Sequence, residues 1–322
     1  MNLKVIDTRR ARAAPALAIV FWGLLVIECR QAREDVEPAR RLFGPVIGNE
    51  VIAGRADDQA GRTWLLVGER TLVTIDLQRA SVERHPLRVG DAACWGLARL
   101  DDGSLWTLKG RSSVIRISES GDVEEEVALG SAHFGLFAAG NRLVVQPADF
   151  QPPAPLLFAA GIGGAARVPW SGLRSRPFNL ARASVAALNM LTCGVGRRDE
   201  RPCWFPDEAA VSLVNAEGRV RRIALDGLEV VAPEVLLTSE NPARPVRDAY
   251  VDSTGTIWIL SSGRASPGAG DQPGGWILAR YSDGGARLGG RHLEESARLI
   301  LRADAGRAVL VTGKGMVAEV VP

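Results

Sequence analysis

Residues 97–129 read LARLDDGSLWTLKGRSSVIRISESGDVEEEVAL, and this stretch decides the fold. It runs through a strand, an Asp/Gly turn, a strand that carries Trp106, a loop, a strand ending in Ser, a second Gly turn and a final strand. Residues 248–288, which begin DAYVDSTGTIWILSSG, have the same layout. Each stretch therefore predicts a four-stranded antiparallel meander.

The unit recurs along the chain. Short apolar strands preceded by turn residues have equivalent positions at Trp64, Trp106, Val144, Trp204, Trp258 and Leu310. Their mean spacing is about 49 residues, within the range of four-stranded repeat units. One such sheet cannot bury both of its faces alone, whereas a ring of them can. The sequence predicts an all-β fold, a six-bladed β-propeller of four-stranded antiparallel blades.

The two ends of the chain are expected to meet. The last unit, residues 298–322, is one strand short, and residues 36–54 contain apolar runs that could supply the missing strand. Closure of this kind removes exposed sheet edges. We therefore expect an N-terminal segment at 1–29, a connector at 30–44 and a single propeller at 45–322.

The N-terminus reads as an export or anchoring segment. Ala13–Ile27 is a run of 15 uncharged residues behind a basic stretch. As a helix it would span about 22 Å, short of the ~30 Å hydrocarbon core, which favours a signal peptide, with a retained membrane anchor as the alternative. The stretch ending at Cys29 resembles a bacterial lipoprotein signal, but Glu28 stands where a small residue is expected. Lipidation of Cys29 is a further alternative.

The formal net charge of +2 belongs to the leader. Residues 1–29 contain four basic and two acidic residues, so the rest of the chain is neutral. A neutral body has no broad positive field, and this excludes nucleic acid as the expected partner.

Cysteine usage favours a location outside the cytoplasm. Cys193 and Cys203 flank a turn-rich stretch between two apolar runs, which predicts a disulfide closing a hairpin. The alternative, half of a metal site, lacks nearby His or further Cys ligands. We expect a periplasmic or extracellular protein that is membrane-tethered through its N-terminal segment, or secreted.

A family resemblance rests on two motifs. The DDGSLWTL sequence at 101–108 and the DSTGTIWIL sequence at 252–260 resemble the repeats of six-bladed propellers of the NHL and SMP-30/gluconolactonase-like type. Because these motifs encode a turn and a core strand, the resemblance implies architecture, with each Trp packed between neighbouring blades, and says little about activity. A monomeric ring is expected.

Local catalytic motifs are absent from the sequence. The three histidines lie in different units and have no spaced carboxylate partner. The resemblance to SMP-30-like proteins implies a divalent cation such as calcium in the central channel, held by one Glu, two Asn and one Asp. The candidates are Glu50, Asn179, Asn189 and Asp248. A metal-dependent, lactonase-like hydrolase is therefore the alternative function.

Three insertions are better candidates for recognition, at residues 147–155, 192–203 and 263–275. The first and third are expected between the second and third strands of a blade, on the face of the channel mouth; the second is expected on the opposite face. Loops on a rigid scaffold commonly carry binding residues, here Asp149, Phe150 and Asp271. The preferred prediction is a non-enzymatic propeller, without a cofactor, that binds a protein, peptide or glycan partner.

Overall fold

The computed structural model divides the chain into two compact units, residues 1–38 and 39–322. The first unit lies outside the described residues, and with it the predicted leader helix and Cys29. The structure describes residues 39–58, 61–129, 133–139, 142–147, 156–160, 164–168, 192–196, 200–204, 208–215, 219–228, 246–262, 275–304 and 306–322.

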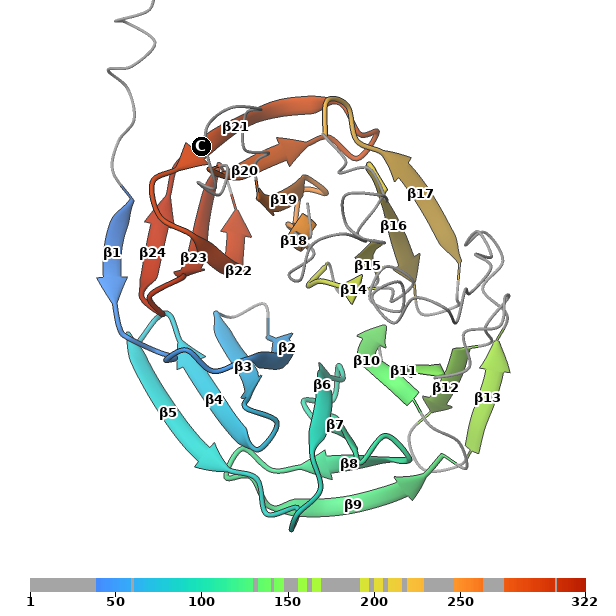
Figure 1. Cartoon of the computed structure of the whole chain (residues 1–322). Helices are drawn as coiled ribbons and strands as arrows, with labels where there is room; N and C mark the ends of the chain where they lie inside the picture. The colour runs from blue at the N-terminus through green and yellow to red at the C-terminus, as the bar shows by residue number, and fades with distance from the viewer. Residues whose placement is uncertain are drawn as a thin grey trace, which may run out of the picture. The chain divides into compact units, whose positions relative to one another are not determined.

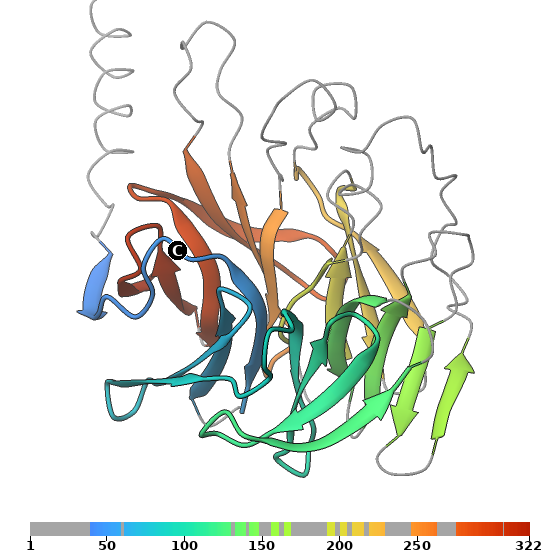
Figure 2. The same cartoon turned by 60° about the horizontal axis from the view of Figure 1, so that its bottom comes forward.

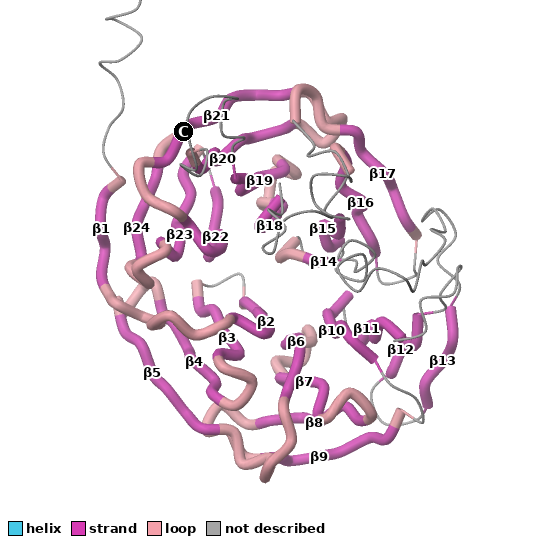
Figure 3. The backbone as a smooth tube through the Cα atoms, viewed as in Figure 1, coloured by secondary structure: helices cyan, strands magenta, loops and turns pink. Residues whose placement is uncertain are grey.

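The second unit is a closed ring of antiparallel sheets around a central axis (Figures 1 and 2). The described strands form six four-stranded sheets. Within the ranges described there are strands, turns and loops but no helix (Figure 3).

Five of the sheets each use four strands that are consecutive in the sequence. They are β2 (Ile52–Asp57), β3 (Arg62–Val67), β4 (Thr71–Asp76) and β5 (Ser81–Pro86); β6 (Cys94–Arg99), β7 (Leu105–Lys109), β8 (Ser113–Ile117) and β9 (Val123–Ala128); β10 (His133–Ala139), β11 (Arg142–Pro147), β12 (Leu156–Ala160) and β13 (Gly164–Val168); β14 (Thr192–Cys193), β15 (Glu200–Trp204), β16 (Ala210–Asn215) and β17 (Val220–Ala224); and β18 (Val246–Val251), β19 (Ile257–Ser262), β20 (Trp276–Tyr281) and β21 (Arg287–Leu293).

The remaining sheet is assembled from both ends of the unit. It contains β22 (Ala297–Asp304), β23 (Arg307–Thr312) and β24 (Val317–Val320), and its outer strand is β1 (Arg40–Phe43). Arg40 pairs with Glu319 and Phe43 with Val317. This pairing covers the edge of β24, which would otherwise expose unpaired N–H and C=O groups.

The structure corrects the predicted fold class and its boundaries. The predicted ring of six blades is corrected to five continuous blades and one composite sheet, in which β22, β23 and β24 are completed by β1. The helix expected within residues 1–29 lies outside the described residues. The predicted connector at 30–44 includes β1, so the ring begins before residue 45. The composite sheet arises because its outer strand, β1, comes from the start of the unit, whereas β22, β23 and β24 come from its end.

The Asp/Gly turn and the following Trp form one hydrogen-bonded unit. Asp252 is buried and its Oδ1 accepts hydrogen bonds from the backbone N–H of Thr254 (2.9 Å) and of Thr256 (3.0 Å). Its Oδ2 accepts one from the Trp258 indole N–H (2.9 Å). Gly255 takes a φ of 88° within the turn, a conformation that glycine adopts at low cost. The motif therefore joins the turn to the core strand.

The core lies between neighbouring sheets. Trp64, Trp106, Trp204 and Trp258 are all less than 5% exposed. Each belongs to an apolar cluster made of residues from two adjacent sheets. The expectation that these tryptophans pack between blades is confirmed.

The backbone of β18 is closely approached by a glycine of the segment that follows β14. The segment after β14 lies along β18, where Val251 N donates to Val195 O (3.0 Å) and a parallel bridge joins Val195 to Tyr250. A Cβ atom on Gly194 would overlap the carbonyl oxygen of Ala249. Only glycine, which has no Cβ atom, therefore fits at position 194.

The Gly194→Ala variant is expected to lose several kcal/mol of stability, because a backbone carbonyl cannot move aside without breaking the contact between β14 and β18. Chemical denaturation of the full chain measures the loss. Gly284→Ala is the matched control, since its nearest neighbour is the Ser282 hydroxyl at 3.7 Å. Equal stability of the two variants would contradict the assigned packing.

Candidate functional site

The centre of the ring contains a buried ion pair between two sheets. Arg55 on β2 donates from Nη1 to Asp248 Oδ2 (2.6 Å) and from Nη2 to Asp248 Oδ1 (3.1 Å). The two side chains are 9% and 8% exposed. Asp248 lies on β18, and Arg55 Nη1 also donates to the carbonyl oxygen of Ile300 on β22 (2.6 Å). One guanidinium thus connects three sheets.

The carboxylate of Asp248 is fully engaged. Besides Arg55, its Oδ2 accepts from Ile300 N (2.7 Å) and its Oδ1 from Ala249 N (3.0 Å). Four donors therefore occupy a group that offers about four lone-pair sites. Asp248, one of the candidate metal ligands, acts in this structure as a hydrogen-bond acceptor for its neighbours.

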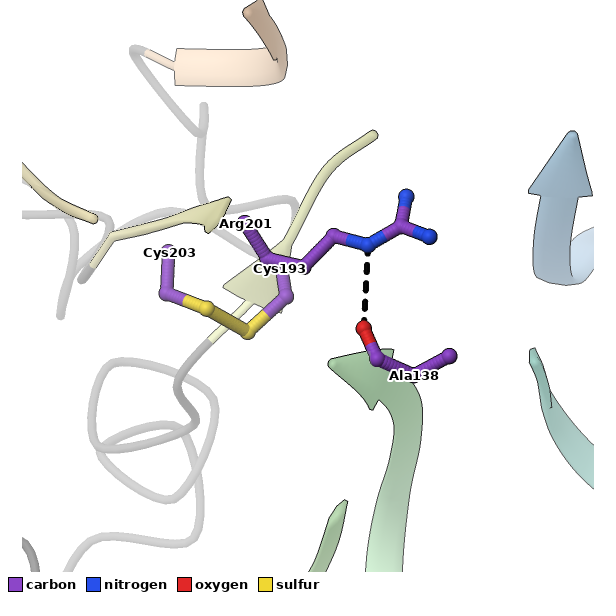
Figure 4. Close-up of a disulfide and its surroundings, with 4 residues drawn as sticks. All are labelled: Ala138, Cys193, Arg201 and Cys203. Atoms are coloured by element: carbon purple, nitrogen blue, oxygen red, sulfur yellow. Dashed lines mark hydrogen bonds between the residues drawn. A yellow bond between two sulfur atoms is a disulfide. The ribbon is translucent and has the colours of Figure 1, made fainter. Parts of the chain in front are cut away.

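A second charged contact crosses the channel from the opposite side. Arg201 on β15 places Nη1 3.8 Å from Asp57 Oδ1 on β2, and its Nε donates to the carbonyl oxygen of Ala138 on β10 (2.9 Å). Figure 4 shows the Arg201 side chain extending away from its strand, with Nε directed at Ala138. The side chains of Arg201 and Asp57 are 14% and 11% exposed.

The disulfide predicted from the sequence is present beside this contact. Cys193 and Cys203 occupy paired positions on β14 and β15 and are bonded to each other (Figure 4). Arg201 stands two residues before Cys203, on the same face of the strand. The disulfide holds the two-residue strand β14 against β15. It is also typical of proteins in oxidising, extracytoplasmic compartments.

Burial governs the ionisation of these groups. It raises the pKa of the Asp57 carboxyl above its ordinary value, and the positive charges of Arg201 and Arg55 offset part of the rise. It lowers the pKa of the Arg201 guanidinium, and raises the pKa of the Tyr250 hydroxyl, which lies in the same charged surroundings. The channel centre is therefore a low-dielectric cluster of mutually compensating charges.

A cavity of about 460 Å³ opens on the face of the ring where β2, β18 and β22, the first strands of their sheets, begin. We call it the rim cavity. It is bounded by the segment before β2, the starts of β18 and β20, the segment around the start of β22, and the connection between β23 and β24. Its lining residues are Asn49, Glu50, Val51, Ile52, Arg247, Trp276, Ser296, Ala297, Arg298 and Gly313.

Two arginines of the rim cavity have defined positions. The Arg247 guanidinium carbon lies 5.4 Å from the ring centroid of Trp276. Arg298 donates from Nη1 to the backbone oxygen of Glu50 (3.2 Å). Stacking on an aromatic face and hydrogen bonding to a carbonyl both restrict a long side chain.

The Glu50 carboxylate has two hydrogen-bond donors of its own, one of them a charged arginine. Its Oε2 accepts from the backbone N–H of Gly48 (3.1 Å) and from Arg84 Nη2 (3.1 Å). These two partners hold the pKa of the Glu50 carboxyl below its ordinary value. The charges of Arg84 and Arg298 also lower this pKa, so Glu50 interacts with arginines on both sides.

The predicted site residues are distributed over different places. Asp248 lies in the channel and accepts hydrogen bonds from Arg55. Glu50 lines the rim cavity and accepts a hydrogen bond from Arg84. Among the described residues no group of three or more His, Cys, Asp or Glu side chains could hold a metal ion. The other candidates, Asn179, Asn189, Asp149, Phe150 and Asp271, lie outside the described residues.

The sequence interpretation missed the arginines that organise both places. Arg201 stands in the sequence next to acidic residues at 199 and 200, a mixed-charge pattern that does not indicate its position, and it reaches the buried centre of the ring. A usable signal existed in β2, IAGRAD, where two charged residues, Arg55 and Asp57, stand among small and apolar residues. A charged side chain that such a strand buries needs an oppositely charged partner, so its presence indicates a buried ion pair.

No protein-family model matches the chain, and no curated protein matches it. Solved structures do. Virginiamycin B lyase from Staphylococcus aureus matches with a TM-score of 0.50 and 11% identity, over 88% of this chain and 97% of that one. Regucalcin from Agrobacterium tumefaciens, described as a calcium-binding protein, matches with a TM-score of 0.52 and 12% identity, over 88% and 93%. The chain shares their β-propeller fold.

At these identities the likeness concerns the fold alone. Activity and ligand do not follow from a shared fold. No helix capable of crossing a membrane is found in the part of the chain that the structure describes.

Replacing Arg55 by Met is expected to cost about 3 to 5 kcal/mol, because it leaves the Asp248 carboxylate buried without its counter-ion. Denaturant unfolding of the full chain measures the loss. Arg307→Met is the matched control: its partner Glu319 is 3.7 Å away, and Arg307 is 68% exposed, so about 1 kcal/mol or less is expected. Similar losses in both variants would contradict a buried, structural role for Arg55.

Asp57 is expected to make stability depend on pH. Because its folded pKa is raised, the folded chain binds this proton more tightly than the unfolded chain, so the contribution of Asp57 to stability declines as pH rises from about 4, the ordinary Asp value, through the folded pKa. The difference in unfolding free energy between the wild type and Asp57→Asn should decline over that range.

The Arg201→Gln variant tests the direction of the pKa shift of Asp57. Removing the nearby positive charge should raise the Asp57 pKa further and extend the pH range of the decline to higher values. A pH dependence unchanged by both substitutions would show that Asp57 does not titrate as assigned.

Proposed function

We propose that this protein is an extracytoplasmic, non-enzymatic binding module whose polypeptide or glycan partner docks on the face that carries the rim cavity. The observation that carries the proposal is the engagement of the channel charges. Asp248 accepts hydrogen bonds from Arg55, Ala249 and Ile300, and Arg201 lies against Asp57. These groups stabilise contacts between sheets, which is a structural role.

The position of the rim cavity supports this proposal. Gly313 lies in the connection between the second and third strands of its sheet, and Trp276 begins the strand that follows the corresponding connection of the sheet before it. The proposed recognition residues Asp149, Phe150 and Asp271 belong to connections of the same type. They are therefore proposed to extend the binding face beyond the cavity.

The disulfide supports the proposed compartment. A stable Cys193–Cys203 bond is typical of the periplasmic or extracellular side, where the N-terminal segment would deliver or anchor the chain.

A metal-dependent, lactonase-like hydrolase remains the second candidate. The fold similarity to regucalcin, described as a calcium-binding protein, is the observation in its favour. In this chain a cation at Asp248 would have to displace Arg55, since carboxylate oxygens bound to an arginine are not free to coordinate calcium.

Site-specific photo-crosslinking tests the docking face. A photoreactive residue placed at Val51, which is 71% exposed and lines the rim cavity, is expected to form a discrete adduct in the cells that make the protein. The same residue at Arg219, in the connection between the third and fourth strands of another sheet, is the control and should form none. Adducts from both positions, or from Arg219 alone, would contradict the proposal.

Calorimetric titration with calcium distinguishes the second candidate. The binding-module proposal expects no calcium binding that depends on Asp248. Binding that is lost in Asp248→Asn while the variant stays folded would favour the hydrolase and overturn the assignment of the channel as structural.

A further inference from the structure

We propose that the Cys193–Cys203 disulfide is a redox-sensitive latch, whose reduction releases residues 192–196 from the ring while the other sheets stay folded. This inference goes beyond the proposed function and does not depend on which partner docks. It follows from the shortness of β14, from the few contacts that hold the segment after it, and from the unequal exposure of the two cysteines.

The inner strand β14 is much shorter than its counterparts in the ring (Figure 1). It has two residues, whereas the inner strands of the other sheets have six to eight. Its register with β15 consists of two pairs, Thr192 with Trp204 and Cys193 with Cys203. The disulfide joins one of these two pairs. Because so short a strand has little pairing of its own, the covalent bond is a large part of what keeps it in the sheet.

The segment that follows β14 is held to its neighbours at few points. Gly194 N donates to Pro202 O (2.8 Å), and Val251 N donates to Val195 O (3.0 Å). Val195 is buried and forms a parallel bridge with Tyr250 on β18. Backbone hydrogen bonds contribute modestly one at a time, so we expect the segment to open locally once the covalent bond is broken.

The two cysteines differ in their exposure to solvent. Cys203 is fully buried, whereas Cys193 is partly exposed. An attacking thiolate therefore approaches the Cys193 sulfur more easily than the Cys203 sulfur.

The reductant that this exposure fits is a dithiol. One of its thiolates attacks Cys193 Sγ, the S–S bond breaks, and Cys203 leaves as a thiolate that takes up a proton. The second thiol of the reductant then attacks the mixed disulfide and releases Cys193 as a thiol. The dithiol is thereby oxidised to its own disulfide, and the protein gains two electrons and two protons.

Release of the segment changes one part of the channel wall. β15 keeps its pairing with β16 at four positions, so Arg201 and Cys203 stay in the sheet. The edge of β15 that β14 covers, and the Val251 N–H on β18, lose their partners. An uncovered strand edge is able to pair with another strand. The latch is thus closed in an oxidising compartment, and a dithiol opens the inner edge of this one sheet.

Hydrogen exchange of the full chain in detergent, followed by mass spectrometry, tests the inference. One sample stays oxidised, and the other is kept in dithiothreitol without denaturant. Peptides that contain the Gly194 and Val251 amides are expected to exchange about tenfold or more faster in the reduced sample, because these amides lose their acceptors. Peptides from β7 should exchange at the same rate in both samples.

Two variants separate the latch from other effects of the reductant. The double variant Cys193→Ser and Cys203→Ser should exchange like the reduced wild type and should not respond to dithiothreitol. Cys94→Ala is the matched control, because Cys94 is a buried free cysteine. Its response to dithiothreitol should equal that of the wild type.

Three outcomes would overturn the inference. They are a disulfide that dithiothreitol does not reduce in the folded chain, unchanged exchange at Gly194 and Val251 after reduction, and faster exchange in every sheet, which would show that the bond stabilises the whole ring. None of them bears on the docking face, which the Val51 adduct tests in the oxidised protein, so failure of the inference and failure of the proposed function are distinguishable.

Discussion

The ring depends on charges that are buried at its centre. Arg55 hydrogen-bonds to Asp248 and to the Ile300 carbonyl, so one guanidinium joins the sheets of β2, β18 and β22. Arg201 approaches Asp57 and bonds to Ala138, which joins the sheets of β15, β2 and β10. Each group would be costly to bury alone, and each compensates another across a sheet boundary. The inner strands are thereby held in one relative arrangement.

This arrangement separates stability from recognition. The charges at the centre have intramolecular partners, and the disulfide secures the short strand β14 next to Arg201. At the rim, Arg247 stacks on Trp276 and Arg298 donates to the Glu50 carbonyl, so the ring also restrains side chains that line the rim cavity. The rigid ring makes such restraint possible.

Periodic features were predictable and isolated contacts were not. The Asp252 turn, the buried Trp258 and the Cys193–Cys203 bond follow from local patterns, because their partners lie within a few residues along the chain. The contribution of residues 36–54 to the last sheet was also predictable, since a closed ring leaves no edge unpaired, and β1 lies inside that segment. The buried position of Arg201 was not predictable, because its partner Asp57 is more than a hundred residues away along the chain.

The sequence by itself determined the all-β repeat, the inter-blade tryptophans and the disulfide, because these depend on short-range periodicity and on turn chemistry. Tertiary structure alone decided which acidic groups are available to a ligand. Asp248 was a candidate metal ligand from the sequence, and in the ring it is the counter-ion of Arg55. Glu50 was another candidate, and it lines the rim cavity as the counter-ion of Arg84. The physical reason is that the ionic role of a side chain depends on which charges folding brings within a few ångströms, and separation along the chain does not encode that distance.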